Sequence, residues 1–135
     1  MTATTDARAV VTAFFDKLGT VGDLDGWHAL LSDDVVVHTP FSPTGDATRF
    51  AGRAEIEARF GAARRRMPSL RFYDLEVLAT EDPQRFVATC RSEGSMANGA
   101  AYANTYCWLF TVVEGRITAW TEYFDPQQVL AVRRP

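Results

Sequence analysis

Three charged side chains fall where neighbouring strands could bring them together. Arg91 and Glu93 are two residues apart in the run RFVATCRSEGSM, so alternation along an extended strand places both on one face. Glu122 lies between Trp120 and Phe124 on one face of RITAWTEYF. A carboxylate among aromatic side chains is costly to ionise, so its pKa should be raised or an arginine should pair with it.

If Arg91 lies between Glu93 and Glu122, the three side chains form an acid–arginine–acid relay. The guanidinium fork can hold both carboxyl groups in a fixed orientation, and one of them can keep a proton near neutral pH. General acid–base catalysis needs such a fixed acid and base. Because the same spacing is common in salt bridges on exposed sheet faces, the structural interpretation stays open beside the catalytic one.

Other residues are candidates for contacts with a substrate. His38 and Thr39 end a short β-branched run before a loop, although alternation with Val36 could turn His38 away. Asn104 and Tyr106 share a strand face and either could bond a substrate oxygen, but that face could equally pack on helices or on a second subunit. The predicted substrate-contacting residues are Thr39, His38, Asn104, Tyr106, Trp120, Phe15 and Phe60.

Hydrophobic spacing divides the chain into helices followed by strands. Residues 5–19 and 53–67 repeat apolar residues at helical spacing, and Asp23 is suited to cap a short helix between them. A strand over 35–39 leads into a loop over 40–52 that is rich in Pro, Gly, Ser and Thr. Four strands follow, over residues 69–80, 85–96, 101–113 and 116–124.

This order predicts an α+β fold in a single domain over residues 1–135. We expect a cone-shaped, curved antiparallel (mixed) sheet with three N-terminal helices that enclose a pocket. The composition agrees, because 135 residues with 47% hydrophobic and 23% charged side chains are typical of one globular domain. Nine Phe, four Tyr and three Trp suffice to fill a core and to line a cavity.

Charge and composition argue against several partner classes. A net charge of −3 does not favour nucleic acid, and no run approaches the roughly 20 apolar residues of a membrane span. The first residues do not resemble a signal peptide. Cys90 and Cys107 lack the spacing of a zinc site and are expected to be reduced. We therefore expect a cytoplasmic protein without metal, cofactor, nucleic-acid or membrane partner.

Two further patterns concern helix ends and assembly. The basic run at residues 64–66 is typical of cations that offset the helix dipole and cap free carbonyls.

Cys107, Trp108, Leu109 and Phe110 alternate between the two faces of one strand, and all four are apolar, so both faces should be buried. In a cone with one sheet this predicts a homodimer through the sheet face.

The closing run VEGRITAWTEYFD, residues 113–125, resembles the last strand of limonene-epoxide-hydrolase-type proteins, which reads EG-K-I-x-x-W-x-D-Y-F-D. Those proteins belong to the nuclear-transport-factor-2-like superfamily, with the SnoaL-like polyketide cyclases and ketosteroid isomerase. DDVVVHTPF (33–41) and GRAEI (52–56) resemble other superfamily motifs. The resemblance spans essentially the whole chain and implies the same cone.

The resemblance also assigns residues. In limonene-type hydrolases an Asp-Arg-Asp relay occupies the positions of Arg91, Glu93 and Glu122, each carboxylate here being one methylene longer. The tyrosine and asparagine that hold water in that family fall on Val37 and Thr39. The relay therefore matches, whereas the water site matches only in part.

Two other branches give different comparisons. The tyrosine and general base of ketosteroid isomerases fall on Phe15 and Thr39, so that route is not expected. SnoaL-like cyclases and phenazine-pathway proteins keep an acid at the position of Glu122. TEDPQRFV and YFDPQQVL resemble the phenazine-type members, whose helix-borne His and nearby Ser fall near Arg59 and Ala63.

The leading hypothesis is a cofactor-independent acid–base enzyme that opens an epoxide on a hydrophobic small molecule, a secondary metabolite, by hydrolysis or ring closure. Glu122 would be the base, Glu93 the acid and Arg91 the group that orients both. The first alternative is a SnoaL-like cyclase or isomerase that works through an enolate with Glu122 alone. The second alternative is a non-catalytic dimer that binds a small ligand.

Overall fold

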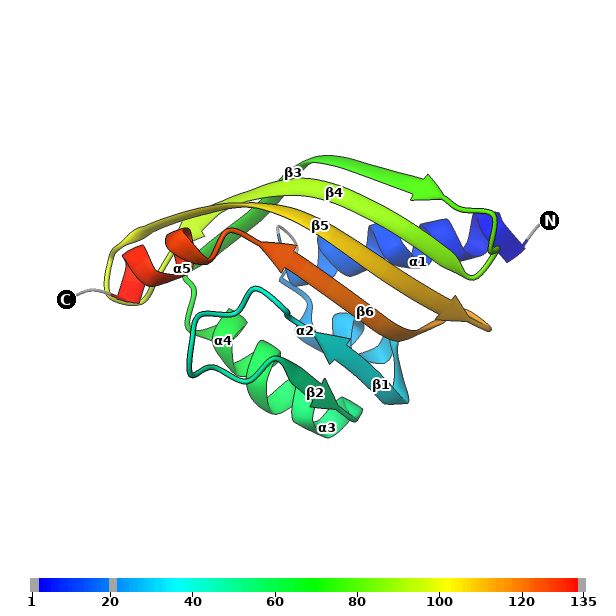
Figure 1. The fold of residues 1–135 in the computed structure, drawn as a ribbon, viewed down its shortest axis with the longest axis horizontal. Coiled ribbons are helices and arrows are strands. Elements are labelled where there is room, and N and C mark those ends of the chain that lie inside the picture. Colours follow the sequence, from blue (N-terminus) through cyan, green and yellow to red (C-terminus); the bar gives the residue numbers. More distant parts are fainter. Residues whose placement is uncertain (1–2, 20–21, 134–135) are drawn as a thin grey trace.

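Helices and strands follow one another along the chain largely as hydrophobic spacing predicts (Figure 1). The computed structural model describes residues 3–19 and 22–133. The helices are α1 (Ala3–Leu18), α2 (Leu24–Ala29), α3 (Arg53–Ile56), the π-helical turn η1 (Glu57–Gly61), α4 (Ala62–Arg65) and α5 (Pro126–Arg133). The strands are β1 (Leu31–His38), β2 (Arg49–Ala51), β3 (Ser69–Ala79), β4 (Arg85–Ser95), β5 (Ala101–Val113) and β6 (Arg116–Phe124).

The six strands form one sheet in the order β2-β1-β6-β5-β4-β3. β1 runs parallel to β6, and the other neighbouring pairs are antiparallel. The sheet arches over α1, α2 and the α3–α4 helix, which lie on its concave side (Figure 1). The predicted α+β fold with a curved mixed sheet is therefore confirmed.

A bulge in β3 contributes to the curvature. Asp74 has a φ of +55°, and the pairing of β3 with β4 shifts register between Tyr73 and Glu76. The extra residue lets both Phe72 and Leu75 pack against the core, although they are three positions apart. The concave face thus stays apolar on both sides of the bend.

Three segments differ from the sequence prediction. β1 begins at Leu31, four residues early, because a register irregularity lets Asp33 and Asp34 point to solvent within the strand. The predicted loop contains β2, which pairs with the end of β1. Helix α5 was not predicted, although its start has a usual signature: Asp125 accepts a hydrogen bond from the amide of Gln127, and a proline fills the first helical position.

The third predicted helix is continuous but irregular. Its middle turn, η1, has π geometry, which holds one residue more per turn than an ideal α-helix. Ile56 before this turn is buried in the core. Phe60, within the turn, packs against Phe50 and Trp120 at ring distances of 5.3 and 5.8 Å.

Phe14 of α1 is the centre of the core. Its ring is fully buried and lies 5.5, 5.1 and 5.0 Å from the rings of Trp108, Phe110 and Trp120, respectively. These edge-to-face contacts join the helix to β5 and β6, and each adds about 0.5–1.5 kcal/mol beyond area burial. Phe14 also contacts Trp27 of α2, at 5.6 Å, so a single side chain links two helices and two strands.

Cys90 and Cys107 are both free thiols. Cys90 is buried on the concave face, whereas Cys107 is half-buried on the outer face of the next strand. Burial raises the pKa of the Cys90 thiol to about 12, so it stays protonated at neutral pH. Among the helices within residues 3–19 and 22–133, none is long and apolar enough to cross a membrane.

Phe14→Ala is expected to lower the free energy of unfolding by about 3–5 kcal/mol, because it removes the ring that joins α1 to the sheet and leaves a cavity. Urea unfolding followed by tryptophan fluorescence measures the change. Phe41→Ala is the matched control: Phe41 is 53% exposed, so its loss should cost less than about 1 kcal/mol. Equal losses in the two variants would contradict this account of the core.

Candidate functional site

A cavity with two adjoining lobes opens on the concave side of the sheet. The inner lobe, about 440 Å³, is walled mainly by apolar side chains that include Trp27, Trp108 and Trp120. The outer lobe, about 540 Å³, lies under the loop that follows β1 and includes Thr39 and Asp46. The residues common to both lobes are Phe60, Ala63, Tyr102, Glu122, Val129 and Arg133.

Strand pairing turns Glu122 into this cavity. Glu122 on β6 pairs directly with Trp108 on β5, which pairs with Ala88 on β4. Directly paired residues point to the same side of a sheet, and both Trp108 and Ala88 are buried in the core. The carboxyl group therefore belongs to the concave face, at the boundary between the two lobes.

The surroundings of Glu122 favour its neutral form. Burial raises the pKa of this carboxyl from 4.5 to about 7. The indole Nε1 of Trp120 donates to Glu122 Oε1 at 3.4 Å, which offsets only part of the effect because the bond is long. A carboxyl group with this pKa can accept and return a proton near neutral pH.

A chain of hydroxyl groups lies on the same face of β4 and β5. The Tyr106 hydroxyl is 2.8 Å from Ser92 Oγ and 3.4 Å from the Tyr102 hydroxyl. Asn104 Nδ2 donates to the Tyr102 oxygen at 2.8 Å. Burial raises the pKa of Tyr102, with a smaller contribution from the charge of Glu122, so this phenol keeps its proton. Tyr102 lines both lobes beside Glu122.

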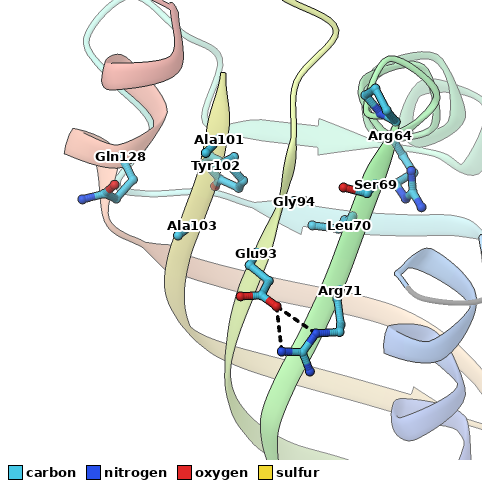
Figure 2. A pocket seen from close by; sticks show the side chains of 11 residues that line it. Arg64, Ser69, Leu70, Arg71, Glu93, Gly94, Ala101, Tyr102, Ala103 and Gln128 are labelled. Atoms are coloured by element: carbon cyan, nitrogen blue, oxygen red, sulfur yellow. Dashed lines mark hydrogen bonds and ion pairs between the residues drawn. The ribbon is translucent and has the colours of Figure 1, made fainter. Parts of the chain in front are cut away.

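The structure does not bring Arg91 and Glu93 to Glu122. Both are exposed on the outer face of β4, where Arg71 donates to Glu93 Oε1 from Nε at 3.0 Å and from Nη2 at 2.8 Å (Figure 2). An open depression of about 840 Å³ adjoins this ion pair, and Glu122 is not part of its wall. The predicted acid–arginine–acid relay is therefore wrong, because Glu122 lies on the opposite face of the sheet.

The other predicted contact residues divide into two groups. Thr39 lines the outer lobe, Phe60 lines both lobes, and Trp120 and Tyr106 line the inner lobe. The remaining three residues, Phe15, His38 and Asn104, do not line either lobe.

Each of these three has a structural reason for its position. Phe15 is buried in the core between α1 and the sheet, with its ring 5.1 Å from that of Trp108. His38, the last residue of β1, is exposed, whereas the residue before it is buried. Asn104 uses all four of its hydrogen-bonding positions, on Tyr102, Thr105 and the backbone of Asp125, so it anchors the start of α5.

Several wall residues were missed because α5 was not predicted. This helix contributes Val129 and Arg133 to both lobes and Val132 to the inner lobe. The Asp-Pro pair at its start was the available signal. Tyr102 was not predicted, and nothing in its local sequence indicated that it meets Glu122.

The chain is similar in sequence to a known domain family and to a protein of that kind. The profile of the SnoaL-like domain matches residues 11–120. A Pseudomonas aeruginosa protein, named an uncharacterised PhzA/B-like protein, is 27% identical over 106 residues, which cover 78% of this chain and 74% of that protein.

Solved structures agree with this fold. A Bacillus subtilis structure provisionally named an isomerase superimposes with a TM-score of 0.88 at 22% identity, covering 97% of this chain and 94% of that one. A Pseudomonas putida structure provisionally named a polyketide cyclase superimposes with a TM-score of 0.78 at 25% identity, covering 97% of each chain.

Glu122→Gln is expected to stabilise the protein at pH 8 by about 3 kcal/mol relative to the parent, and by little at pH 4.5. The pKa of Glu122 is higher in the folded state, so its contribution to stability is complete below about 4.5 and declines as the pH rises towards about 7. Urea unfolding of both proteins at several pH values measures the difference between their free energies of unfolding. The contributions of the other titrating groups cancel in this difference. A difference that does not change with pH would contradict the raised pKa.

Proposed function

The chain belongs to the SnoaL-like domain family, and on this basis we propose that it is a cofactor-independent acid–base enzyme of the cyclase or isomerase type. Its substrate would be a hydrophobic carbonyl compound that reacts through an enolate. The observation that carries the proposal is the Glu122 carboxyl group, which has a pKa of about 7 in an aromatic cavity. The polyketide cyclase name of the Pseudomonas putida structure supports the same reaction class.

In the proposed reaction, the Glu122 carboxylate removes a proton from the carbon beside a substrate carbonyl group. The C–H electron pair forms the C=C bond of an enolate, and the carbonyl π electrons move to oxygen. The enolate carbon then attacks a second carbonyl carbon of the same molecule, or a different carbon of the conjugated system takes a proton. Protonated Glu122 returns its proton to the new alkoxide or to that carbon, so no proton is gained or lost.

Tyr102 is suited to stabilise the enolate oxygen. Its oxygen already accepts a hydrogen bond from Asn104 Nδ2, so its own proton points elsewhere. Among the described residues, the acceptor within reach is the Tyr106 oxygen at a long 3.4 Å. A substrate oxygen in the cavity would be a better acceptor, and a hydrogen bond to a developing negative charge is stronger than one to a neutral oxygen.

The enolate route agrees better with the geometry than epoxide opening does. Epoxide opening by a relay requires a second acid that protonates the leaving oxygen while Glu122 activates the nucleophile. Glu93, expected in that role, is paired with Arg71 on the outer face. Enolate chemistry needs one carboxyl group that works in both directions, and Glu122 satisfies that condition alone.

Exchange of the α-protons of 2-tetralone in D₂O, followed by NMR, tests the proposed chemistry without knowledge of the natural substrate. The parent protein should accelerate the exchange, and Glu122→Gln should reduce the acceleration at least about a hundredfold with the fold retained. Arg91→Gln is the matched control on the outer face and should keep the parent rate.

Other results of the exchange experiment would exclude the proposal. Full activity of Glu122→Gln would exclude the mechanism. Binding of 2-tetralone without exchange would favour the ligand-binding alternative. Loss of activity in Arg91→Gln would restore the relay.

We further propose that the outer face of the sheet pairs with a second copy of the chain. Val87, Cys107, Leu109 and Tyr123 form a half-buried apolar row across the outer face of β4, β5 and β6. The described helices α1 to α4 lie on the opposite, concave side (Figure 1). Packing two such faces together would remove this row from water.

Sedimentation velocity at micromolar concentration is expected to show a dimer for the parent protein and a monomer for Leu109→Lys, because the charge would lie in the centre of the paired sheets. Leu130→Lys is the matched control and should remain a dimer, since Leu130 is 37% exposed and belongs to helix α5, not to the sheet. A monomeric parent protein would contradict the assembly.

A further inference from the structure

Arginine side chains gather around the cavity although the whole chain is negative. The net charge of the protein is −3, yet the charged residues of the two lobes are four arginines against two acids. The arginines are Arg59, Arg64, Arg66 and Arg133, and the acids are Asp46 and Glu122. Because burial favours the neutral form of Glu122, the wall is more positive than this count suggests.

The three consecutive arginines at the end of α4 have different roles. Arg64 donates to the carbonyl oxygens of Leu18, Gly19 and Met67 at 2.5, 3.1 and 2.9 Å, so it fastens the end of α1. Arg65 pairs with Glu57 at 2.7 Å on the helix surface. Arg66 lines the inner lobe, is exposed, and has no ion-pair partner among the residues that the structure describes.

Arg133 and Arg59 complete a cationic rim. Both are exposed and line the outer lobe, and Arg133 lines the inner lobe as well. The guanidinium carbon of Arg59 lies 5.8 Å from the centre of the Phe50 ring. This cation–π contact leaves the guanidinium group able to pair with an anion. Exposed side chains that also line a cavity lie at its opening, so Arg66 lies at the opening of the inner lobe, Arg59 at that of the outer lobe, and Arg133 borders both. We call these three residues the arginine rim.

We propose that the substrate is an amphipathic acid, with a hydrophobic body in the inner lobe and a carboxylate held by the arginine rim. This inference rests on the proposed function in taking the cavity as the substrate site. A guanidinium group binds a carboxylate through two parallel hydrogen bonds, and the apolar wall of the inner lobe matches a ring system. Arg133 and Glu122 line both lobes, so they can act on the two ends of one molecule.

Asp46 marks where the carboxylate would bind. Its Oδ2 accepts a hydrogen bond from Arg133 Nη2 at 2.8 Å, which links the loop after β1 to helix α5 across the outer lobe. The two side chains are 37% and 52% exposed, respectively, and an ion pair of that kind contributes little to stability. A substrate carboxylate can therefore take the place of Asp46 on Arg133 at little cost.

Calorimetric titration with 1-naphthoate and with the neutral, isosteric 1-naphthamide tests the inference. The parent protein should bind naphthoate about tenfold more tightly, and Arg133→Gln or Arg66→Gln should remove most of that preference without weakening naphthamide. Arg65→Gln is the matched control on the same helix and should change neither affinity. Asp46→Asn should tighten naphthoate alone, because it removes the competing carboxylate.

Equal affinities of the parent protein for the two probes would overturn the inference, and so would an unchanged preference in both Arg133→Gln and Arg66→Gln. The experiment is independent of turnover. Glu122→Gln should keep the carboxylate preference while it loses α-proton exchange, so failure of the catalytic proposal and failure of the binding proposal give different results.

Discussion

The packing of Phe14 against the aromatic rings of β5 and β6 is the contact on which the remaining structure depends. It holds α1 against the concave face, and it determines where the solid core ends and the cavity begins. Trp108 and Trp120 belong to both regions, because they contact Phe14 and also line the inner lobe. Glu122 lies two residues beyond Trp120, so the aromatic core directly supports the strand that carries it.

The same packing creates a conflict between stability and reactivity. Aromatic side chains exclude water from one side of Glu122, and the loss of hydration favours the protonated acid. A better hydrated or better paired carboxyl group would stabilise the fold near neutral pH but would be a weaker base. The long hydrogen bond from Trp120 orients the carboxyl group without giving it a full partner. Functional sites often retain such a cost, which the rest of the core has to offset.

Strand alternation predicted which residues share a face but not which face is turned inward. The relay was wrong because it turned Arg91 inward. Phe86, Ala88 and Cys90 alternate with Arg91 along the strand, and the apolar residues of a strand prefer the core. Glu122 was placed correctly because its face also carries Trp120. The two lobes depend on long-range packing of α5 and of the loop after β1, which no local pattern specifies.

The π-helical turn η1 has a consequence for how this cavity can change. A turn with one extra residue shifts the following side chains by about 100° around the helix axis relative to an uninterrupted α-helix. Phe60 and Ala63, which line both lobes, belong to that turn and to the one after it. The insertion or deletion of a single residue in this helix would therefore change which side chains line the cavity more than any one substitution would, and the sheet would stay unchanged.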